Sequence, residues 1–197
     1  MTEQLRIWAG LQGFLSAAAL LSLLLFFALA TPFGAERRQW SWLGPVNDWL
    51  SVVGAVPWIV AMVLLAGRAR APVWVWVLTG AVAAGIVAGA VVTLLMLAGR
   101  ATLPLQATVT LPVAVAGYAW MAIVGGYAAG AVAIARWVAL FAYVLLAALL
   151  LAVAVVGLAF ALPESSRTPL FVIGGVVGGL AWAGFPVWWL AVASTAR

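Results

Sequence analysis

Residues 137–161 read WVALFAYVLLAALLLAVAVVGLAFA, and no charged side chain interrupts this stretch. A transmembrane helix needs roughly 20 mostly apolar residues, and in lipid it has to satisfy its backbone polar groups within itself. Five further stretches have the same character, and the nine Arg and four acidic residues lie near their ends or between them. We therefore predict an all-α integral membrane protein with six transmembrane helices in one compact bundle.

The composition supports this prediction and limits the number of domains. With 68% hydrophobic and 7% charged residues, the chain has too few polar side chains to cover the surface of a soluble protein. A length of 197 residues accommodates about six spans and leaves no room for a sizeable soluble domain. We expect a single membrane domain over residues 1–197. Its spans are predicted at residues 7–30, 49–66, 73–97, 110–135, 137–161 and 170–193.

The arginines indicate an orientation. Cytoplasmic loops of membrane proteins carry an excess of positive charge, and an N-in/C-in arrangement places slightly more arginines inside than outside. The inside set is Arg6, Arg68, Arg70, Arg136 and Arg197, and the outside set is Arg37, Arg38, Arg100 and Arg167. We expect the bacterial cytoplasmic (inner) membrane. The net charge of +5 does not predict a nucleic-acid partner, because the arginines are scattered rather than gathered on one face.

Three missing residue types exclude several functions. The chain contains no Lys, His or Cys, so it offers no lysine for a retinal Schiff base and none of the usual ligands of haem, zinc, copper or iron–sulfur clusters. A buried proton relay is disfavoured as well, because no predicted span contains a charged residue. We expect no required cofactor, no metal site and no catalysis. A bound lipid, quinone or carotenoid is compatible with the composition.

The tryptophans divide into two groups. Most lie near the ends of the predicted spans, where Trp is enriched at membrane interfaces, and Trp188 and Trp189 are assigned to the inner belt. Trp58, Trp120 and Trp182 instead fall near the middle of their spans, with Tyr118 and Tyr127 close by. These five residues form a candidate pocket for a flat apolar ligand. The alternative is that their rings simply fill space between helices rich in Gly and Ala.

Small residues recur at four-residue spacing in three spans, a pattern that lets helix backbones approach closely. The pairs are Gly85/Gly89, Gly126/Gly130, Gly174/Gly178 and Gly175/Gly179. We predict that these glycines lie at helix interfaces. Either packing within the chain or contact with a membrane-protein partner or a second copy is consistent with the spacing.

Polar residues on the predicted outer face form a second candidate site. They are Glu36, Arg37, Arg38, Asn47, Asp48, Arg100, Gln106, Glu164 and Arg167. Asp48 and Glu164 both precede spans that enter from this face, so two carboxylates would be available for acid–base chemistry if they met. The alternative is that Asn47 and Asp48 cap the helix that follows, with Asp48 paired to a nearby Arg.

These features favour a non-catalytic membrane protein that binds an apolar ligand or the transmembrane helices of a partner. Membrane lipids are the expected surroundings. A small-solute transporter or permease subunit, with kinks at Pro57 and Pro186 as gates, is the first alternative. An outer-face enzyme that acts on a lipid head group through Asp48 and Glu164 is the second.

Overall fold

The computed structural model describes residues 2–31 and 38–197, without the side chains of residues 165 and 166. The described part of the chain is helical and contains no β-strand. The helices are α1 (Thr2–Leu25), α2 (Leu43–Arg68), α3 (Val73–Leu97), α4 (Leu103–Gly130), α5 (Arg136–Ala161) and α6 (Glu164–Thr195), with short turns η1 (Phe26–Ala30) and η3 (Arg38–Trp40). All six long helices belong to segments apolar and long enough to cross a membrane. The predicted all-α bundle of six apolar helices is confirmed.

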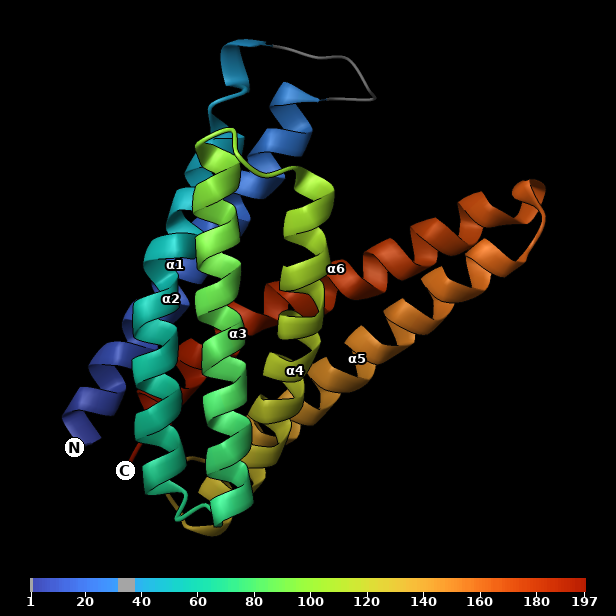
Figure 1. Ribbon diagram of the computed structural model, residues 1–197. Helices are drawn as coiled ribbons and strands as arrows, with labels where there is room; N and C mark the ends of the chain where they lie inside the picture. The colour runs from blue at the N-terminus through green and yellow to red at the C-terminus, as the bar shows by residue number, and fades with distance from the viewer. Residues whose placement is uncertain (1, 32–37) are drawn as a thin grey trace.

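The six helices form a ring. Each helix packs against the next one along the chain, and α6 returns to pack against α1. Both termini therefore lie at one end of the bundle, together with the α2–α3 and α4–α5 turns (Figure 1). We call this the termini end, and we call the opposite end, where α1 connects to α2 and α3 to α4, the far end.

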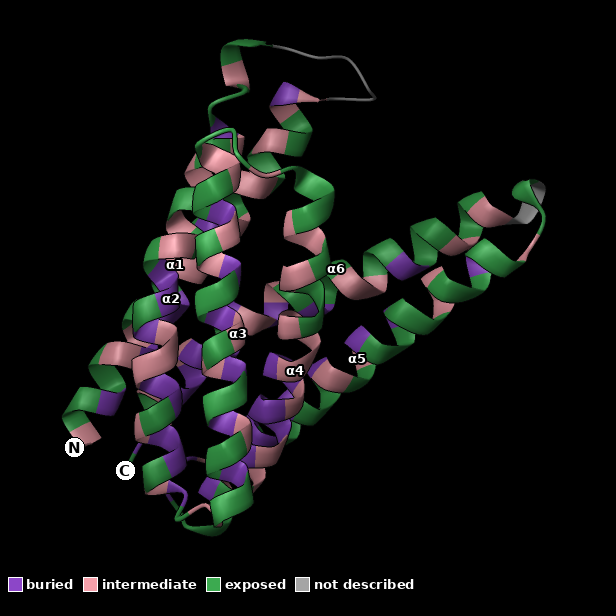
Figure 2. Ribbon diagram, viewed as in Figure 1, coloured by how far each residue is buried: buried purple, intermediate pink, exposed green. Residues whose placement is uncertain are grey.

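The ring of helices is wider towards the far end than at the termini end. Helices α1 to α4 run side by side, whereas the α5–α6 hairpin leans away from them towards the far end (Figure 1). Buried residues accordingly concentrate towards the termini end, and the far end and the hairpin tip are mostly exposed (Figure 2). Exposed apolar side chains are the expected surface of a bundle in lipid, where the hydrocarbon is as apolar as Leu.

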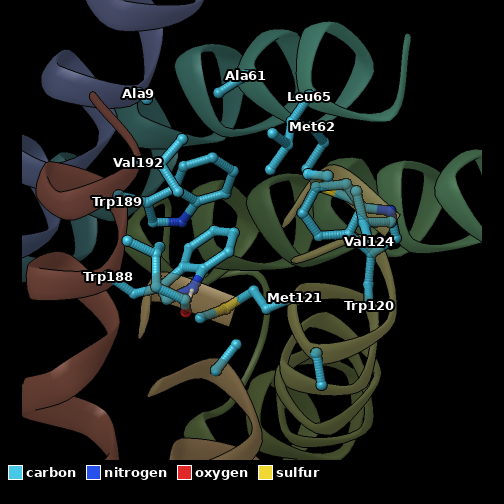
Figure 3. Close-up of a cluster of buried hydrophobic side chains, with 14 of the residues drawn as sticks. Ala9, Ala61, Met62, Leu65, Trp120, Met121, Val124, Trp188, Trp189 and Val192 are labelled. Atoms are coloured by element: carbon cyan, nitrogen blue, oxygen red, sulfur yellow. Dashed lines mark hydrogen bonds between the residues drawn. The ribbon is translucent and has the colours of Figure 1, made fainter. Parts of the chain in front are cut away.

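A cluster of tryptophans forms the centre of the core (Figure 3). Trp188 and Trp189 lie edge to face with ring centroids 4.8 Å apart, and Trp120 stacks on Trp189 at 6.2 Å. Trp120 Nε1 donates to Thr79 Oγ1 (2.8 Å), and Trp188 Nε1 donates to the Val138 carbonyl (3.0 Å). These contacts connect α3, α4, α5 and α6. The prediction that Trp188 and Trp189 belong to an interfacial belt was wrong, because both are fully buried.

The C-terminal residues fasten the termini end. The Arg6 guanidinium donates from Nε (3.1 Å) and Nη2 (2.7 Å) to the Ala196 carbonyl, which lies just beyond α6. The backbone N–H of Arg197 donates to the Ala133 carbonyl in the α4–α5 turn (2.9 Å). The start of α1, the end of α6 and the α4–α5 turn are thereby held together.

The ends of α2, α3 and α4 share one geometry. In each, a residue with positive φ follows the helix, and its own backbone N–H and that of the next residue donate to carbonyls of the last turn, which is a Schellman motif. The positive-φ residues are Arg70 (φ 49), Gly99 (φ 71) and Val132 (φ 57). A β-branched residue is strained in this region, so Val132 is the unusual case.

Four observed helices begin ahead of the predicted spans, among them α1 at Thr2 and α6 at Glu164, where residues 7 and 170 were predicted. Helix α4 is shifted towards the N-terminus relative to the predicted span 110–135, and residues 131–135 form the turn that Val132 initiates. Helix α2 starts at Leu43, ahead of the predicted span 49–66. Both helices begin early because Pro45 and Pro104 sit in the first turn, where no backbone N–H needs an intrahelical partner. Asn47 and Asp48 therefore lie inside α2, and the expectation that they cap it was wrong.

Candidate functional site

A cavity of about 380 Å³ lies between α1, α2, α3, α4 and α6. We call the part of the cavity nearest the far end, lined by Asn47, Asp48 and Gln106, its mouth, and the part deeper along the same helices its floor. From Asp48 to Trp58 the rise along α2 is roughly 15 Å at 1.5 Å per residue. Helix α6 leans away from the far ends of α1 and α4 (Figure 1), and its residues Trp182, Phe185 and Pro186 line the cavity.

Aromatic rings form the floor. Trp58 of α2 meets Phe185 of α6 edge to face, with centroids 5.0 Å apart and ring planes at 71°. Tyr118 of α4 lies 5.7 Å from Phe185, and its hydroxyl donates to the Ala181 carbonyl (2.9 Å). Helices α2, α4 and α6 therefore meet at the aromatic ring of Phe185. Trp182 and Pro186 of α6 complete this part of the wall.

Glycines allow the helices to approach where the cavity ends. A Cβ on Gly117 would lie 3.1 Å from Cζ2 of Trp58, so the absence of a side chain lets the indole rest on the α4 backbone. Gly54 and Gly89 line the cavity itself, and neither contributes a side chain that would fill it. The volume thus depends on small residues.

Two polar atoms in the cavity wall have no hydrogen-bond partner among the described residues. They are Oε1 of Gln12 and Nε1 of Trp58. Gln12 is only 2% exposed, and its Nε2 donates to Ser16 Oγ at 2.9 Å. Its Oε1 approaches within 3.6 Å of the position that a Cβ on Gly54 would occupy, and Gly54 precedes Trp58 by about one helical turn. Gln12 Oε1 therefore lies beside α2, about one helical turn from the residue that carries the second unsatisfied atom.

The mouth is polar, and most of its polar side chains have hydrogen-bond partners within the protein. Asn47 Nδ2 donates to Asp48 Oδ1 (3.2 Å), and Gln106 Nε2 donates to Thr93 Oγ1 (3.1 Å), which joins α3 to α4. Asp48 is the one charged group among the described residues that line the cavity. Within the described ranges the recorded ion pair is Arg167–Glu164 at 3.9 Å, so the expected pairing of Asp48 with an Arg is not seen there.

The predicted aromatic pocket is partly brought together. Trp58, Tyr118 and Trp182 line the cavity. Trp120 does not, because it is fully buried in the tryptophan core. Tyr127 is 40% exposed and lies beside Trp74, with centroids 6.2 Å apart, away from the cavity.

The predicted outer-face site is divided between two places. Asn47, Asp48 and Gln106 line the mouth of the cavity. Glu164 and Arg167 pair with each other at the start of α6, and the α5–α6 turn stands apart from the start of α2 (Figure 1). The structure therefore does not bring Asp48 and Glu164 together. Arg38 and Arg100 are exposed, and Glu36 and Arg37 lie outside the described residues.

Not all of the predicted glycines lie at a helix interface. Gly85 and Gly89 face α4 and Gly174 and Gly178 face α5, because a Cβ on each would meet a residue of that helix within 3.4 Å. Gly126 faces Tyr143 of α5 in the same way. The described atoms leave open space around the remaining three, which are Gly130, Gly175 and Gly179.

Most lining residues had no place in the predicted sites, and Gln12 and Phe185 are the two among them with a marked role. Gln12 is a polar residue within an apolar span, a feature typical of helix–helix hydrogen bonding, and a sequence does not reveal whether such an amide is satisfied. Phe185 is one of many apolar residues in α6, and its role becomes visible only when three helices are placed around it.

The cavity presents mainly aromatic and aliphatic side chains with a few polar groups. Among the described residues no cluster of Asp or Glu side chains is suited to hold a metal ion. The floor offers aromatic faces, one indole N–H and one amide oxygen, and the mouth offers one carboxylate. Comparisons with protein families, with curated proteins and with solved structures find no match for this chain.

Proposed function

We propose that this protein is a non-catalytic membrane protein that binds an apolar, membrane-dissolved ligand in the cavity between α1, α2, α3, α4 and α6. The observation that carries the proposal is the cavity with its aromatic floor. Its volume of about 380 Å³ lies in the range of small-molecule sites, which are mostly apolar and have a few placed polar groups. A lipid, a quinone or a carotenoid fits this description.

The tilt of the α5–α6 hairpin supports entry from the bilayer. The cavity is only partly enclosed, and α6 does not cover the far ends of α1 and α4 (Figure 1). A ligand dissolved among the lipid chains would reach the floor without crossing water. We place the protein in the bacterial cytoplasmic membrane with both termini inside, on the slight excess of arginine at the termini end.

Filling the cavity tests the proposal. Ala90→Phe adds a ring to a residue of α3 that lines the cavity, and Ala88→Phe adds the same ring to an exposed position of the same helix. Protein purified from the membrane is extracted with organic solvent, and small molecules are quantified by absorbance and mass spectrometry. We expect a ligand to copurify with wild type and Ala88→Phe and to be depleted in Ala90→Phe. Equal recovery from all three proteins would sink the proposal.

A transporter is the second candidate, and the position of Pro186 favours it. Proline removes one helix hydrogen bond and kinks the helix, and Pro186 lies in the cavity wall next to Phe185. Bending of α6 at this point would open or close the floor. Flux of small solutes into liposomes that contain the protein, lost in Asp48→Asn and retained in the exposed control Arg100→Gln, would favour transport over static binding.

Binding of a partner's transmembrane helix is the third possibility. Gly175 and Gly179 are exposed on the α5–α6 hairpin with open space beside them, so a helix of a partner or a second copy has access to the α6 backbone. Gly179→Leu should then lower the recovery of an oligomer or complex. The inward-facing control Gly178→Leu would instead disturb the packing of α6 on α5.

A further inference from the structure

The unsatisfied atoms in the cavity wall restrict the chemistry of the ligand. Gln12 Oε1 is an acceptor without a donor, and Trp58 Nε1–H is a donor without an acceptor, among the described residues. Leaving buried polar atoms unpaired is costly in free energy, and such atoms in a native structure call for an explanation. A third unsatisfied atom, Trp189 Nε1, belongs to a residue of the tryptophan core that does not line the cavity.

Neighbouring side chains cover both atoms, so a ligand reaches them through small rearrangements. The terminal torsion of a glutamine has a broad energy minimum, and the Gln12 amide therefore adjusts at low cost. Trp58 is less buried than Gln12 and packs against Gly117 and Phe185, where the ring has an edge on the cavity. A ligand at the floor therefore contacts the Gln12 amide on its α1 side and the Trp58 indole on its α2 side.

The region around these atoms is uncharged. No arginine lines the cavity among the described residues, and the single carboxylate, Asp48, is at the mouth, about ten residues from Trp58 along α2. An ionised head group would meet no compensating charge at the floor, and burying it there would be expensive. The polar part of a ligand at this depth is therefore neutral.

The shape of the floor indicates a flat ring. Trp58, Tyr118 and Phe185 present aromatic edges and faces, and offset or edge-to-face contact with another ring is favourable. A hydrocarbon carotenoid or an acyl tail would fill the volume and leave both polar atoms unpaired. A ring with hydroxyl groups satisfies both, because one hydroxyl donates to Gln12 Oε1 and another oxygen accepts from Trp58 Nε1.

We infer that the cavity binds a quinol-type ligand, with its neutral hydroxylated ring at the floor between Gln12 and Trp58 and its apolar tail directed towards the open side. This inference rests on the proposed function, since it names the ligand class of the same cavity. It selects one of the three ligand types that volume alone admits. A site built to hydrogen-bond a hydroxyl discriminates strongly against an analogue that lacks it.

Three probes of equal tail length test the inference in lipid nanodiscs under anaerobic conditions. They are an alkyl-substituted benzoquinol, its di-O-methyl ether, which keeps the acceptor oxygens and lacks the donors, and an alkylbenzene without oxygen. Dissociation constants are measured by titration calorimetry. We expect wild type to bind the quinol at least about tenfold more tightly than the ether.

Three variants separate the two contacts. Gln12→Leu should make the dissociation constants of the quinol and the ether about equal. It should leave the binding of the alkylbenzene unchanged, which would also show that the cavity is intact in this variant. Trp58→Phe should weaken quinol and ether by the same factor, because both accept from the indole. Gln4→Leu, which makes the same change at an exposed glutamine of α1 that does not line the cavity, should keep the wild-type ratio.

Three other outcomes would each contradict a different part of the inference. If all three probes bind equally to wild type, the cavity is a general apolar site, so the proposed function stands and the quinol assignment falls. If Gln12→Leu keeps the wild-type ratio, the ligand hydroxyl does not donate to Gln12, and the quinol assignment falls. If no probe binds, the quinol assignment falls, and loss of copurifying ligand in Ala90→Phe then decides separately whether the cavity binds anything.

Discussion

The indole of Trp58 and the ring of Phe185 meet edge to face, with centroids 5.0 Å apart, and close the cavity between α2 and α6. This contact joins two residues that are far apart in the sequence and that belong to helices with no extensive packing against each other. It exists because Gly117 leaves room for the indole on α4. The geometry of the floor therefore depends on a residue that has no side chain.

The first prediction concerns Gly117→Ala. The new Cβ would lie 3.1 Å from Trp58 Cζ2, closer than most real contacts, so the indole has to move by a few tenths of an ångström. We expect a loss of stability of about 1 kcal/mol and weaker binding of the cavity ligand. Thermal unfolding in detergent and ligand recovery are the measurements. Gly130→Ala is the control, because nothing lies within 4 Å of its Cβ, and it should be neutral or slightly stabilising. Equal effects of the two substitutions would contradict the contact.

The second prediction concerns the hydrogen bond from Trp120 Nε1 to Thr79 Oγ1, which is 2.8 Å long and fully buried. Trp120→Phe and Thr79→Val each remove it, and the double variant should be less destabilised than the sum of the two. The expected coupling is roughly 0.6–1.7 kcal/mol, as for other interhelical hydrogen bonds in membranes. Denaturation of the four proteins in the same detergent measures it. Strict additivity would show that the bond contributes nothing net.

The six helices were predictable because charge is absent from their interiors, and this property needs no knowledge of neighbours. The tilt of the α5–α6 hairpin was not predictable, because α5 is apolar on all sides. Leu158 is exposed and the adjacent Ala159 is buried, yet hydropathy does not distinguish a side chain that faces lipid from one that faces protein. The cavity was therefore hidden as well.

The position of Trp188 and Trp189 shows the same limit. Both are near the end of the last predicted span, where interfacial tryptophans are common. In the structure both side chains are fully buried, and the end of α6 also bonds Arg6 through the Ala196 carbonyl and the α4–α5 turn through Arg197. Their burial depends on contacts with residues that are distant in the sequence, which hydropathy does not reveal. For the candidate site, sequence reasoning found Trp58, Tyr118 and Trp182 and missed Gln12 and Phe185.

The third prediction concerns Val132, which has a φ of 57° in the α4–α5 turn. A left-handed conformation costs a non-glycine residue roughly 1–2 kcal/mol, and the exposed Val132 side chain has little packing to offset this. We expect Val132→Gly to raise the free energy of unfolding by about 1 kcal/mol. The reverse change at an equivalent turn, Gly99→Val, should lower it. The midpoint of thermal unfolding checks both, and a destabilised Val132→Gly would show that the side chain is needed.

The fourth prediction concerns Arg6, whose guanidinium donates two hydrogen bonds to the Ala196 carbonyl. Hydrogen bonds from charged groups contribute about 1.5–3 kcal/mol, and Arg6→Ala should lose a similar amount. Helix α6 should then fray at its C-terminal end, which hydrogen exchange at residues 192–196 would detect. Arg100→Ala is the control, since Arg100 is exposed and no side-chain hydrogen bond is recorded for it among the described residues. Unchanged exchange in Arg6→Ala would contradict the fastening role.

The fifth prediction concerns orientation, and the absence of Cys makes it directly testable. Single cysteines are placed at Ser41 and Thr102, which are exposed at the far end, and at Ala131, which is exposed in the α4–α5 turn at the termini end. With both termini in the cytoplasm, an impermeant thiol reagent added to intact cells should label positions 41 and 102 and should spare position 131 until the membrane is permeabilised. Labelling of position 131 alone would reverse the orientation, and the cavity mouth with Asp48 would then lie on the cytoplasmic side.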